Sequence, residues 1–223
     1  MKTLIFDLDG TLIDSVPDIS ASLNRAFTGE GLAPIAIERV KVLISLGARA
    51  MVEQAARESG CGPNTNFDDL RDLFLSEYKA RPIENTVVYP GVFDVLDKLK
   101  ADGVLLGICT NKPKKTASTV IPALGLDGYF SATLYSDSQP YKKPDPRHVH
   151  DVIDLLGGDA AEAVFIGDSE IDLAAAHNAD LPIVLVSYGY SLAPPHELEA
   201  DVLINHFSDL PNALDEISQQ QKR

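Results

Sequence analysis

The sequence lacks several features that point to particular classes of protein. It contains no tryptophan and only two cysteines, Cys61 and Cys109, among 223 residues. Two cysteines this far apart, one of them in an apolar run, do not make a disulfide framework, so we expect reduced thiols. No apolar stretch approaches the roughly 20 residues of a membrane span, and residues 1–8 lack the pattern of a signal peptide. We therefore expect a cytoplasmic protein without a membrane partner.

Basic residues are also scarce. There are 19 Lys and Arg residues against 33 Asp and Glu residues, which gives a formal net charge of −14. This is the wrong sign for a protein that follows a phosphate backbone, so no nucleic-acid partner is expected. The five histidines lack the spacing of metal ligands near the motifs described below, and we expect surface residues rather than zinc ligands. The remaining composition, 45% hydrophobic and 23% charged, is that of an ordinary globular chain.

Short apolar runs alternate with helical patterns over most of the chain. The runs cover residues 4–8, 104–109, 132–135, 164–166 and 183–186. Between the first two, apolar residues recur at helical spacing until Gly103, and a similar pattern precedes Gly157. Strands that alternate with helices form parallel sheets, so the sequence predicts an α/β fold with a Rossmann-like, doubly wound parallel sheet.

Residues 15–80 differ because they show helical patterns without strands. Pro17 and Pro34 suit the first turns of helices, and residues 61–64 break one helix from the next. We expect a four-helix insertion, with a core domain made of residues 1–14 and 83–223 and a small helical domain over residues 15–82. Hinges between the two are expected near residues 14–17 and 81–90.

Two carboxylates follow the first apolar run. Asp7 and Asp9 leave the predicted strand at its carboxyl end, where ligands bind in open α/β sheets. Gly10 permits a sharp turn over a bound group. Two acids this close repel each other unless a cation or a shared proton lies between them. A solvated turn is the alternative for an isolated Asp-x-Asp sequence, but a buried strand before it and Gly-Thr after it favour a site.

Polar residues follow two further segments. Thr110 and Asn111 end the second apolar run and suit the oxygens of a phosphate, although a helix cap is the alternative. Lys142 and Lys143 precede Pro144 in a segment whose alternative is a charged loop. Each signal is weak alone, but both lie where the predicted fold gathers ligand-binding groups.

A third acidic segment follows the run at residues 164–166. Asp168 and Asp172 become neighbours on one helical face if a helix begins near Ser169. Together, the four segments supply carboxylates, a hydroxyl, an amide and a lysine. These groups fit phosphoryl transfer assisted by a hard divalent ion such as Mg²⁺, with an aspartate nucleophile. The net charge does not oppose an anionic substrate, because surface charges beyond about 8 Å are screened.

The four segments, in this order, resemble the four signature motifs of the haloacid dehalogenase superfamily. The resemblance covers nearly the whole chain, and the helical insertion is similar to the small cap domain of that family. Residues 6–19, 89–92 and 188–190 further resemble the phosphoglycolate phosphatases of the superfamily.

The resemblance implies roles for the four aspartates. Asp7 would attack phosphorus and form an aspartyl-phosphate, and Asp9 would protonate the leaving alcohol and then deprotonate water. The carboxylates of Asp7 and Asp168, with the backbone carbonyl of Asp9, would hold Mg²⁺. Asp172 would help to position the metal shell. The acid at position 9 favours a phosphatase or phosphomutase over a dehalogenase.

The resemblance also implies how substrate is bound. Thr110 and Asn111 would bind the phosphoryl group, and Lys143 would bridge nucleophile and phosphate, with Lys142 as the competing assignment. Specificity would come from the cap, where Arg49 could bind the carboxylate of a substrate such as 2-phosphoglycolate, although a solvated arginine at a helix start is the alternative.

We therefore expect a Mg²⁺-dependent phosphatase for a small phosphorylated metabolite, with 2-phosphoglycolate as the leading substrate and a monomer or homodimer as its state. An inorganic pyrophosphatase, a sugar or nucleotide phosphatase and a phosphomutase are alternatives within the superfamily. A phospho-accepting receiver domain is the alternative of another class, and its Asp, Thr and Lys lie at a similar sheet edge. The helical insertion, the Asp-x-Asp spacing and the late Gly-Asp-Ser argue against a receiver.

Overall fold

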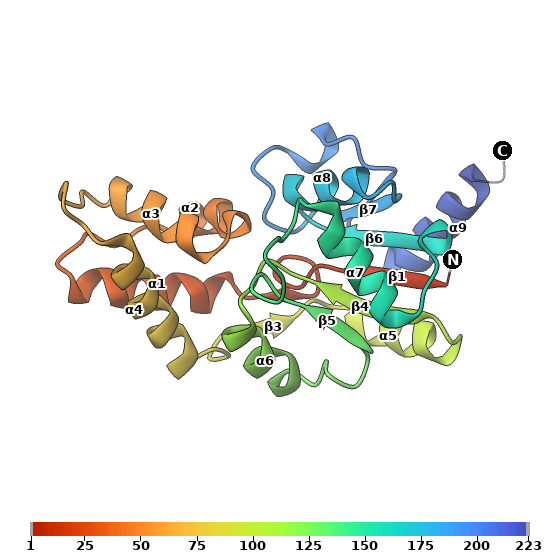
Figure 1. The fold of residues 1–223 in the computed structure, drawn as a ribbon, viewed down its shortest axis with the longest axis horizontal. Coiled ribbons are helices and arrows are strands. Elements are labelled where there is room, and N and C mark those ends of the chain that lie inside the picture. Colours follow the sequence, from red (N-terminus) through yellow and green to blue (C-terminus); the bar gives the residue numbers. More distant parts are fainter. Residues whose placement is uncertain (1, 222–223) are drawn as a thin grey trace.

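The computed structural model describes residues 2–221 as a six-stranded sheet with helices on both faces and four further helices beside it (Figure 1). All neighbouring strands of this sheet are parallel, in the order β5-β4-β1-β6-β7-β8. The strands are β1 (Thr3–Phe6), β4 (Leu105–Cys109), β5 (Ala132–Leu134), β6 (Ala163–Gly167), β7 (Ile183–Val186) and β8 (Val202–Ile204). The predicted α/β class is confirmed.

The chain builds the sheet outward from β1 in two directions. It adds β4 and β5 on one side of β1, and then β6, β7 and β8 on the other. The strand order therefore reverses at β1, and in such sheets ligands bind at this reversal, beyond the carboxyl ends of the strands. The motifs after β1, β4 and β6 all lie at that edge.

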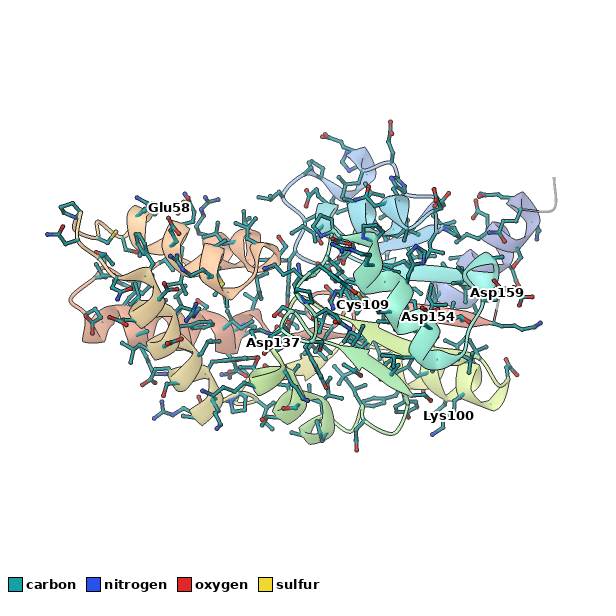
Figure 2. The ribbon with its side chains drawn as sticks, in the orientation of Figure 1. Glu58, Lys100, Cys109, Asp137, Asp154 and Asp159 are labelled. Atoms are coloured by element: carbon teal, nitrogen blue, oxygen red, sulfur yellow. The ribbon has the colours of Figure 1, made fainter. Side chains whose placement is uncertain are left out.

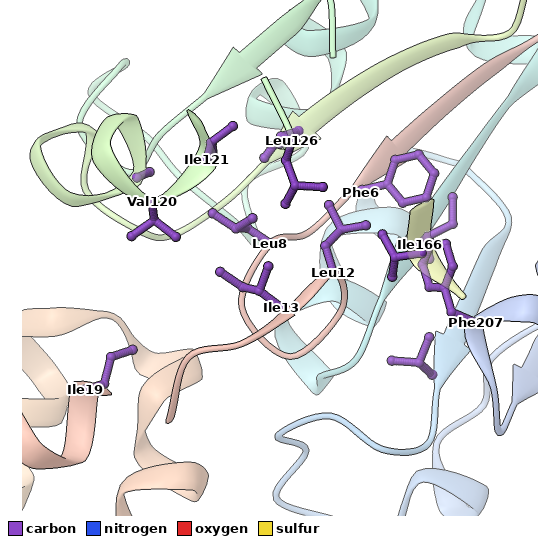
Figure 3. Packing of buried hydrophobic residues seen from close by; sticks show 14 of the residues in the cluster. Phe6, Leu8, Leu12, Ile13, Ile19, Val120, Ile121, Leu126, Ile166 and Phe207 are labelled. Carbon is purple, nitrogen blue, oxygen red and sulfur yellow. The ribbon is translucent and has the colours of Figure 1, made fainter. Parts of the chain in front are cut away.

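Alternation along β1 separates the two faces of the sheet. Leu4 and Phe6 belong to one hydrophobic cluster and Ile5 to another, and all three are fully buried. Figure 3 shows Phe6 among Leu12, Ile166 and Phe207 in the first cluster. Helices α5 (Val92–Ala101), α6 (Lys114–Ala123) and α9 (Leu210–Gln220) cover this face, and α7 (Pro146–Leu156) and α8 (Glu170–Asn178) cover the other.

The four further helices lie between β1 and α5 in the sequence. They are α1 (Val16–Gly29), α2 (Ile37–Leu43), α3 (Ala48–Glu58) and α4 (Phe67–Ala80). Helix α4 packs against both α1 and α3, and its C-terminal part approaches α6 beside the sheet. The expected run of four helices without a strand is thus present over residues 16–80.

A small antiparallel ladder marks where the chain leaves the sheet and returns to it. Its strands are β2 (Ile13–Asp14) and β3 (Val87–Val88). Beside it, the buried carboxylate of Asp18 accepts hydrogen bonds from the backbone and side chains of Asn85 and Thr86. Burial opposes the charge of Asp18, but these hydrogen bonds hold its pKa below the ordinary value.

Several local features differ from the sequence prediction. Strands β2, β3 and β8 were not expected, nor were the short 3₁₀ helices at Ile44–Leu46, Ala160–Glu162, Pro195–Glu197 and Phe207–Asp209. The expectation that all histidines lie on the surface is wrong for His148, which is fully buried on α7. Its ring nitrogens contact the Cys109 thiol and the Tyr135 carbonyl, and Figure 2 labels Cys109 where α7 crosses the sheet.

Within residues 2–221, none of the helices combines the length and apolar character that crossing a membrane requires.

Candidate active site

A pocket lies where the carboxyl edge of the sheet faces the four-helix segment of residues 16–80. Its lining combines residues that follow β1, β4 and β6 with residues of α1, α3 and α4. Every predicted site residue except Arg49 contributes to it, namely Asp7, Asp9, Thr110, Asn111, Lys143, Asp168 and Asp172. The fold thus brings together side chains that are up to 165 residues apart, the separation of Asp7 and Asp172.

Three buried acids form the centre of the site. Carboxylate oxygens of Asp7, Asp168 and Asp172 all lie within 4.8 Å of one another. Burial raises the pKa of Asp7 to about 7 although Lys143 opposes the shift, and burial together with Asp172 and Asp7 raises that of Asp168 well above its ordinary value. Three carboxylates beside one lysine leave negative charge uncompensated, and hard divalent cations favour such oxygen ligands. The residues present therefore fit Mg²⁺.

Lys143 is the cation of this cluster. Its Nζ lies 2.6 Å from Asp172 Oδ1 and 2.8 Å from Asp7 Oδ1, and its side chain is 2% exposed. Burial disfavours the ammonium, but Asp172 and Asp7 outweigh burial and raise its pKa. Lys142 is absent from the pocket lining within residues 2–221, although its Nζ approaches Gly47, which belongs to that lining. Of the two lysines that the sequence left open, Lys143 is the one in the pocket.

The start of α8 explains why Asp172 is held so firmly. Ser169 is the N-cap of α8, and the Ser169 hydroxyl donates to Asp172 Oδ2 over 2.7 Å. The same oxygen accepts from the backbone amides of Asp168 and Ser169, while Oδ1 accepts from Lys143. A capping box thus fixes the carboxylate that in turn positions the lysine.

Asp168 is fixed from two other segments. Its Oδ1 accepts from the Thr11 hydroxyl at 2.9 Å and its Oδ2 from the Tyr190 amide at 2.7 Å. Gly10 has a φ of 89°, and a Cβ on it would lie 2.3 Å from Asp168 Oδ2. Only glycine allows the turn after β1 to approach this carboxylate so closely.

Thr110 and Asn111 follow β4 in the same pocket. The alternative of a helix cap is excluded, because α6 has Pro113 as its N-cap and no side-chain cap hydrogen bond. Asn111 Nδ2 donates to the Lys143 carbonyl at 3.1 Å, while its Oδ1 is buried and without a partner among the described residues. Because Oδ1 can only accept, a phosphate oxygen would have to meet the second N–H of Asn111 Nδ2 or the O–H of Thr110, whose oxygen accepts from the Lys112 amide at 3.1 Å.

Lys112 is a pocket residue that the sequence analysis missed. It is 6% exposed, and its Nζ lies 2.9 and 3.1 Å from the two carboxylate oxygens of Asp9. The ammonium also lies 4.7 Å from the ring centroid of Tyr78 on α4. Ser15 donates a further hydrogen bond to Asp9. Burial opposes the charge of Lys112, but Asp9 helps to raise its pKa above the ordinary value.

Arg49 does not take the place that the sequence suggested. It is absent from the pocket lining within residues 2–221, and its guanidinium pairs with Glu53 at 2.6 Å and Asp68 at 2.9 Å. It also lies over the ring of Phe67, 5.4 Å from the centroid. Two acids and an aromatic ring hold this arginine against its own helical segment, so it makes no contribution to the pocket in this structure.

Comparisons with known proteins agree with the arrangement. The model of the haloacid dehalogenase-like hydrolase family matches residues 4–186. A phosphoglycolate phosphatase from Agrobacterium fabrum is 39% identical over 212 residues, covering 94% of this chain and 91% of that protein. One from Caulobacter vibrioides is also 39% identical over 212 residues, with 95% and 90% covered.

A solved structure is similar over a comparable length. The crystal structure of a predicted phosphoglycolate phosphatase from Haemophilus somnus superimposes with a TM-score of 0.87 at 30% identity, covering 95% of this chain and 97% of that one. The family resemblance read from the motifs is therefore confirmed. Because the family model spans most of the chain and these relatives match over nearly their whole length, this chain belongs to the haloacid dehalogenase-like hydrolases.

Proposed function

We propose that this chain is a Mg²⁺-dependent phosphatase that hydrolyses small phosphomonoesters through an aspartyl-phosphate, with 2-phosphoglycolate as its substrate. The observation that carries the proposal is the buried group of Asp7, Lys143, Asp168 and Asp172 at the strand reversal of a hydrolase fold. The substrate follows from the two phosphoglycolate phosphatases that match over 90% or more of their length.

The metal would be held by the carboxylates of Asp7 and Asp168 and by the backbone carbonyl of Asp9, with Asp172 supporting this group. When bound, Mg²⁺ supplies positive charge that offsets the charge of the phosphoryl group. Lys143 adds a second positive charge on the side of Asp7 and Asp172. Together they permit an anionic ester to enter a pocket that is lined by acids.

The reaction then divides between two aspartates. A carboxylate oxygen of Asp7 attacks phosphorus, the bond from phosphorus to the ester oxygen breaks, and Asp9 donates a proton to the departing alkoxide. In the second step Asp9 accepts a proton from water, whose oxygen attacks the aspartyl-phosphate and releases phosphate and free Asp7. Thr110 and Asn111 would bind the phosphoryl oxygens throughout.

The helical segment of residues 15–82 would act as a cap on a core of residues 1–14 and 83–223. Several pocket-lining residues belong to α1, α3 and α4, so movement of this segment would open the pocket and its return would exclude bulk water. Both chain crossings lie near the β2–β3 ladder, where a hinge would act. We expect the enzyme to work in the cytoplasm as a monomer or homodimer.

Phosphate release from a substrate panel tests the proposal. The panel contains 2-phosphoglycolate, pyrophosphate, hexose phosphates and nucleotides, each with Mg²⁺ and with EDTA. We expect sustained, Mg²⁺-dependent release with 2-phosphoglycolate preferred. Formation of an acyl-phosphate without sustained release would instead indicate a receiver, and preference for another compound would reassign the substrate.

A further inference from the structure

The uncharged lining on the helical side of the pocket raises a question about substrate recognition. The pocket residues that come from α1, from the start of α3 and from α4 include Ile19, Met51, Phe74 and Tyr78, and none of the lining residues within 16–80 carries a charge. A carboxylate on the leaving group needs a positive charge or several hydrogen-bond donors once it leaves water. A positive charge for it must therefore come from outside residues 16–80, which can supply hydrogen-bond donors such as the hydroxyls of Ser45 and Tyr78.

Two lysines line the pocket among residues 2–221, and one of them already forms ion pairs with two carboxylates. Lys143 bridges Asp7 and Asp172 at 2.8 and 2.6 Å, where the phosphoryl group would react. Lys112 is paired with Asp9 alone among the carboxylates. An ammonium has three N–H donors, and the two contacts to Asp9 leave capacity for another acceptor.

A second, independent feature lies beside Lys112. The hydroxyl of Tyr78 is buried and faces the Lys112 ammonium, but its own O–H has no acceptor among the described residues. Buried hydroxyls are normally hydrogen-bonded, so an unpartnered one that lines a pocket points to a ligand. The ring of Tyr78 is 4.7 Å from Lys112 Nζ, so the two groups face one region of the pocket.

We propose that Lys112 and Tyr78 form the subsite that recognises a carboxylate on the leaving group of the substrate, in the place that the sequence assigned to Arg49. The inference rests on the proposed phosphatase function and names its specificity-determining residues. Lys112 supplies the charge from the end of β4, and Tyr78 supplies an O–H donor from α4, so the subsite is complete only when the helical segment covers the sheet edge.

Two substrates of equal length test the subsite. They are 2-phosphoglycolate and 2-hydroxyethyl phosphate, which has a hydroxymethyl group in place of the carboxylate. The readout is the ratio of their kcat/KM values in the Lys112→Met and Tyr78→Phe variants, with Lys114→Met as the matched control. Lys114 is exposed at the start of α6, two residues from Lys112. Because the ratio cancels any effect that Lys112→Met has on proton transfer by Asp9, it reports recognition of the carboxylate.

We expect the parent enzyme and Lys114→Met to favour 2-phosphoglycolate. Lys112→Met should lower that preference about 10- to 100-fold, the range for hydrogen bonds to a charged group, and Tyr78→Phe about 3- to 10-fold, the range for an ordinary hydrogen bond. Equal losses on both substrates, or an unchanged ratio in the two variants, would overturn the inference and leave the phosphatase function intact. A parent enzyme that does not hydrolyse 2-phosphoglycolate would instead overturn the proposed function. If Lys112→Met fails to fold, the substrate ratio of Tyr78→Phe alone tests the subsite, because this variant removes a single oxygen atom.

Discussion

Replacing Asp7 by asparagine should abolish turnover and, in the absence of divalent ions, make the protein more stable. Asp7 lies buried against Asp168 and Asp172, and burial raises its pKa from 3.8 to about 7. A raised pKa means that the folded state disfavours the ionised form. Without a metal, the ionised carboxylate of the proposed nucleophile therefore destabilises the fold.

The size of this effect follows from proton linkage. The stability that protonated Asp7 contributes is complete below about pH 4 and is lost as the pH rises toward about pH 7, because the unfolded state releases its proton first. A shift of about three pKa units corresponds to about 4 kcal/mol as an upper limit. Asparagine does not titrate, so we expect Asp7→Asn to exceed the parent by about 2 to 4 kcal/mol at about pH 8.

Urea unfolding in EDTA across this pH range measures the difference. Asp127→Asn serves as the control, since Asp127 is an exposed acid on the loop after α6 and should change little. Addition of Mg²⁺ should stabilise the parent and should have a much smaller effect on Asp7→Asn, because a ligand stabilises only the state that binds it. A parent protein that is more stable than Asp7→Asn in EDTA at about pH 8 would refute the reasoning.

Three further predictions address other parts of the molecule. Asp9→Asn should reduce kcat strongly with alcohol leaving groups and less with phenolic ones, whose departure needs no proton; equal losses in steady-state assays would argue against proton transfer by Asp9. Asp18→Asn should lower the free energy of unfolding by about 2 to 3 kcal/mol, because the carboxylate accepts charge-assisted hydrogen bonds from Asn85 and Thr86. The pKa of Asp18 is lowered in the folded state, so the difference in the free energy of unfolding between the variant and the parent should shrink as the pH falls below about pH 4. If urea unfolding shows a difference that does not depend on pH, this account is wrong. Arg49→Ala should change kcat/KM equally for 2-phosphoglycolate and 2-hydroxyethyl phosphate, since Arg49 pairs with Glu53 outside the pocket; a selective loss would return it to the substrate site.

The sheet could be predicted because its strands carry a strong local signal. The central strands of the sheet are apolar runs buried on both faces, as β1 illustrates with Leu4 and Phe6 on one side and Ile5 on the other. Strand β8 was missed because Val202 and Leu203 are only half-buried at the sheet edge. Strands β2 and β3 were missed because two-residue strands have no periodicity and depend on a partner 73 residues or more away.

The parts of the site attached to strand ends could be predicted for a related reason. Strand position fixes where Asp7, Thr110 and Asp168 emerge, whatever the details of packing. Long basic side chains are different, because their direction depends on which acids lie nearby in the folded chain. Lys112 extends to Asp9 in the pocket, whereas Arg49 pairs with Asp68 on another helix. Neither Asp9 nor Asp68 can be recognised as a partner from sequence spacing, whereas Glu53, four residues after Arg49, can.

The charges of the pocket explain how an acidic chain can bind an anion. Among residues 2–221, four aspartates and two lysines line it. Lys143 is paired with Asp7 and Asp172, and Lys112 is paired with Asp9. Asp168 is left with a hydroxyl and a backbone amide as donors, and neither cancels its charge. A divalent cation beside Asp168 and Asp7 would complete the balance. In the proposed mode of binding, Lys143 would lie toward the phosphoryl group and Lys112 toward the leaving group, so a substrate with negative charge at both ends would match the site better than one with a single charge.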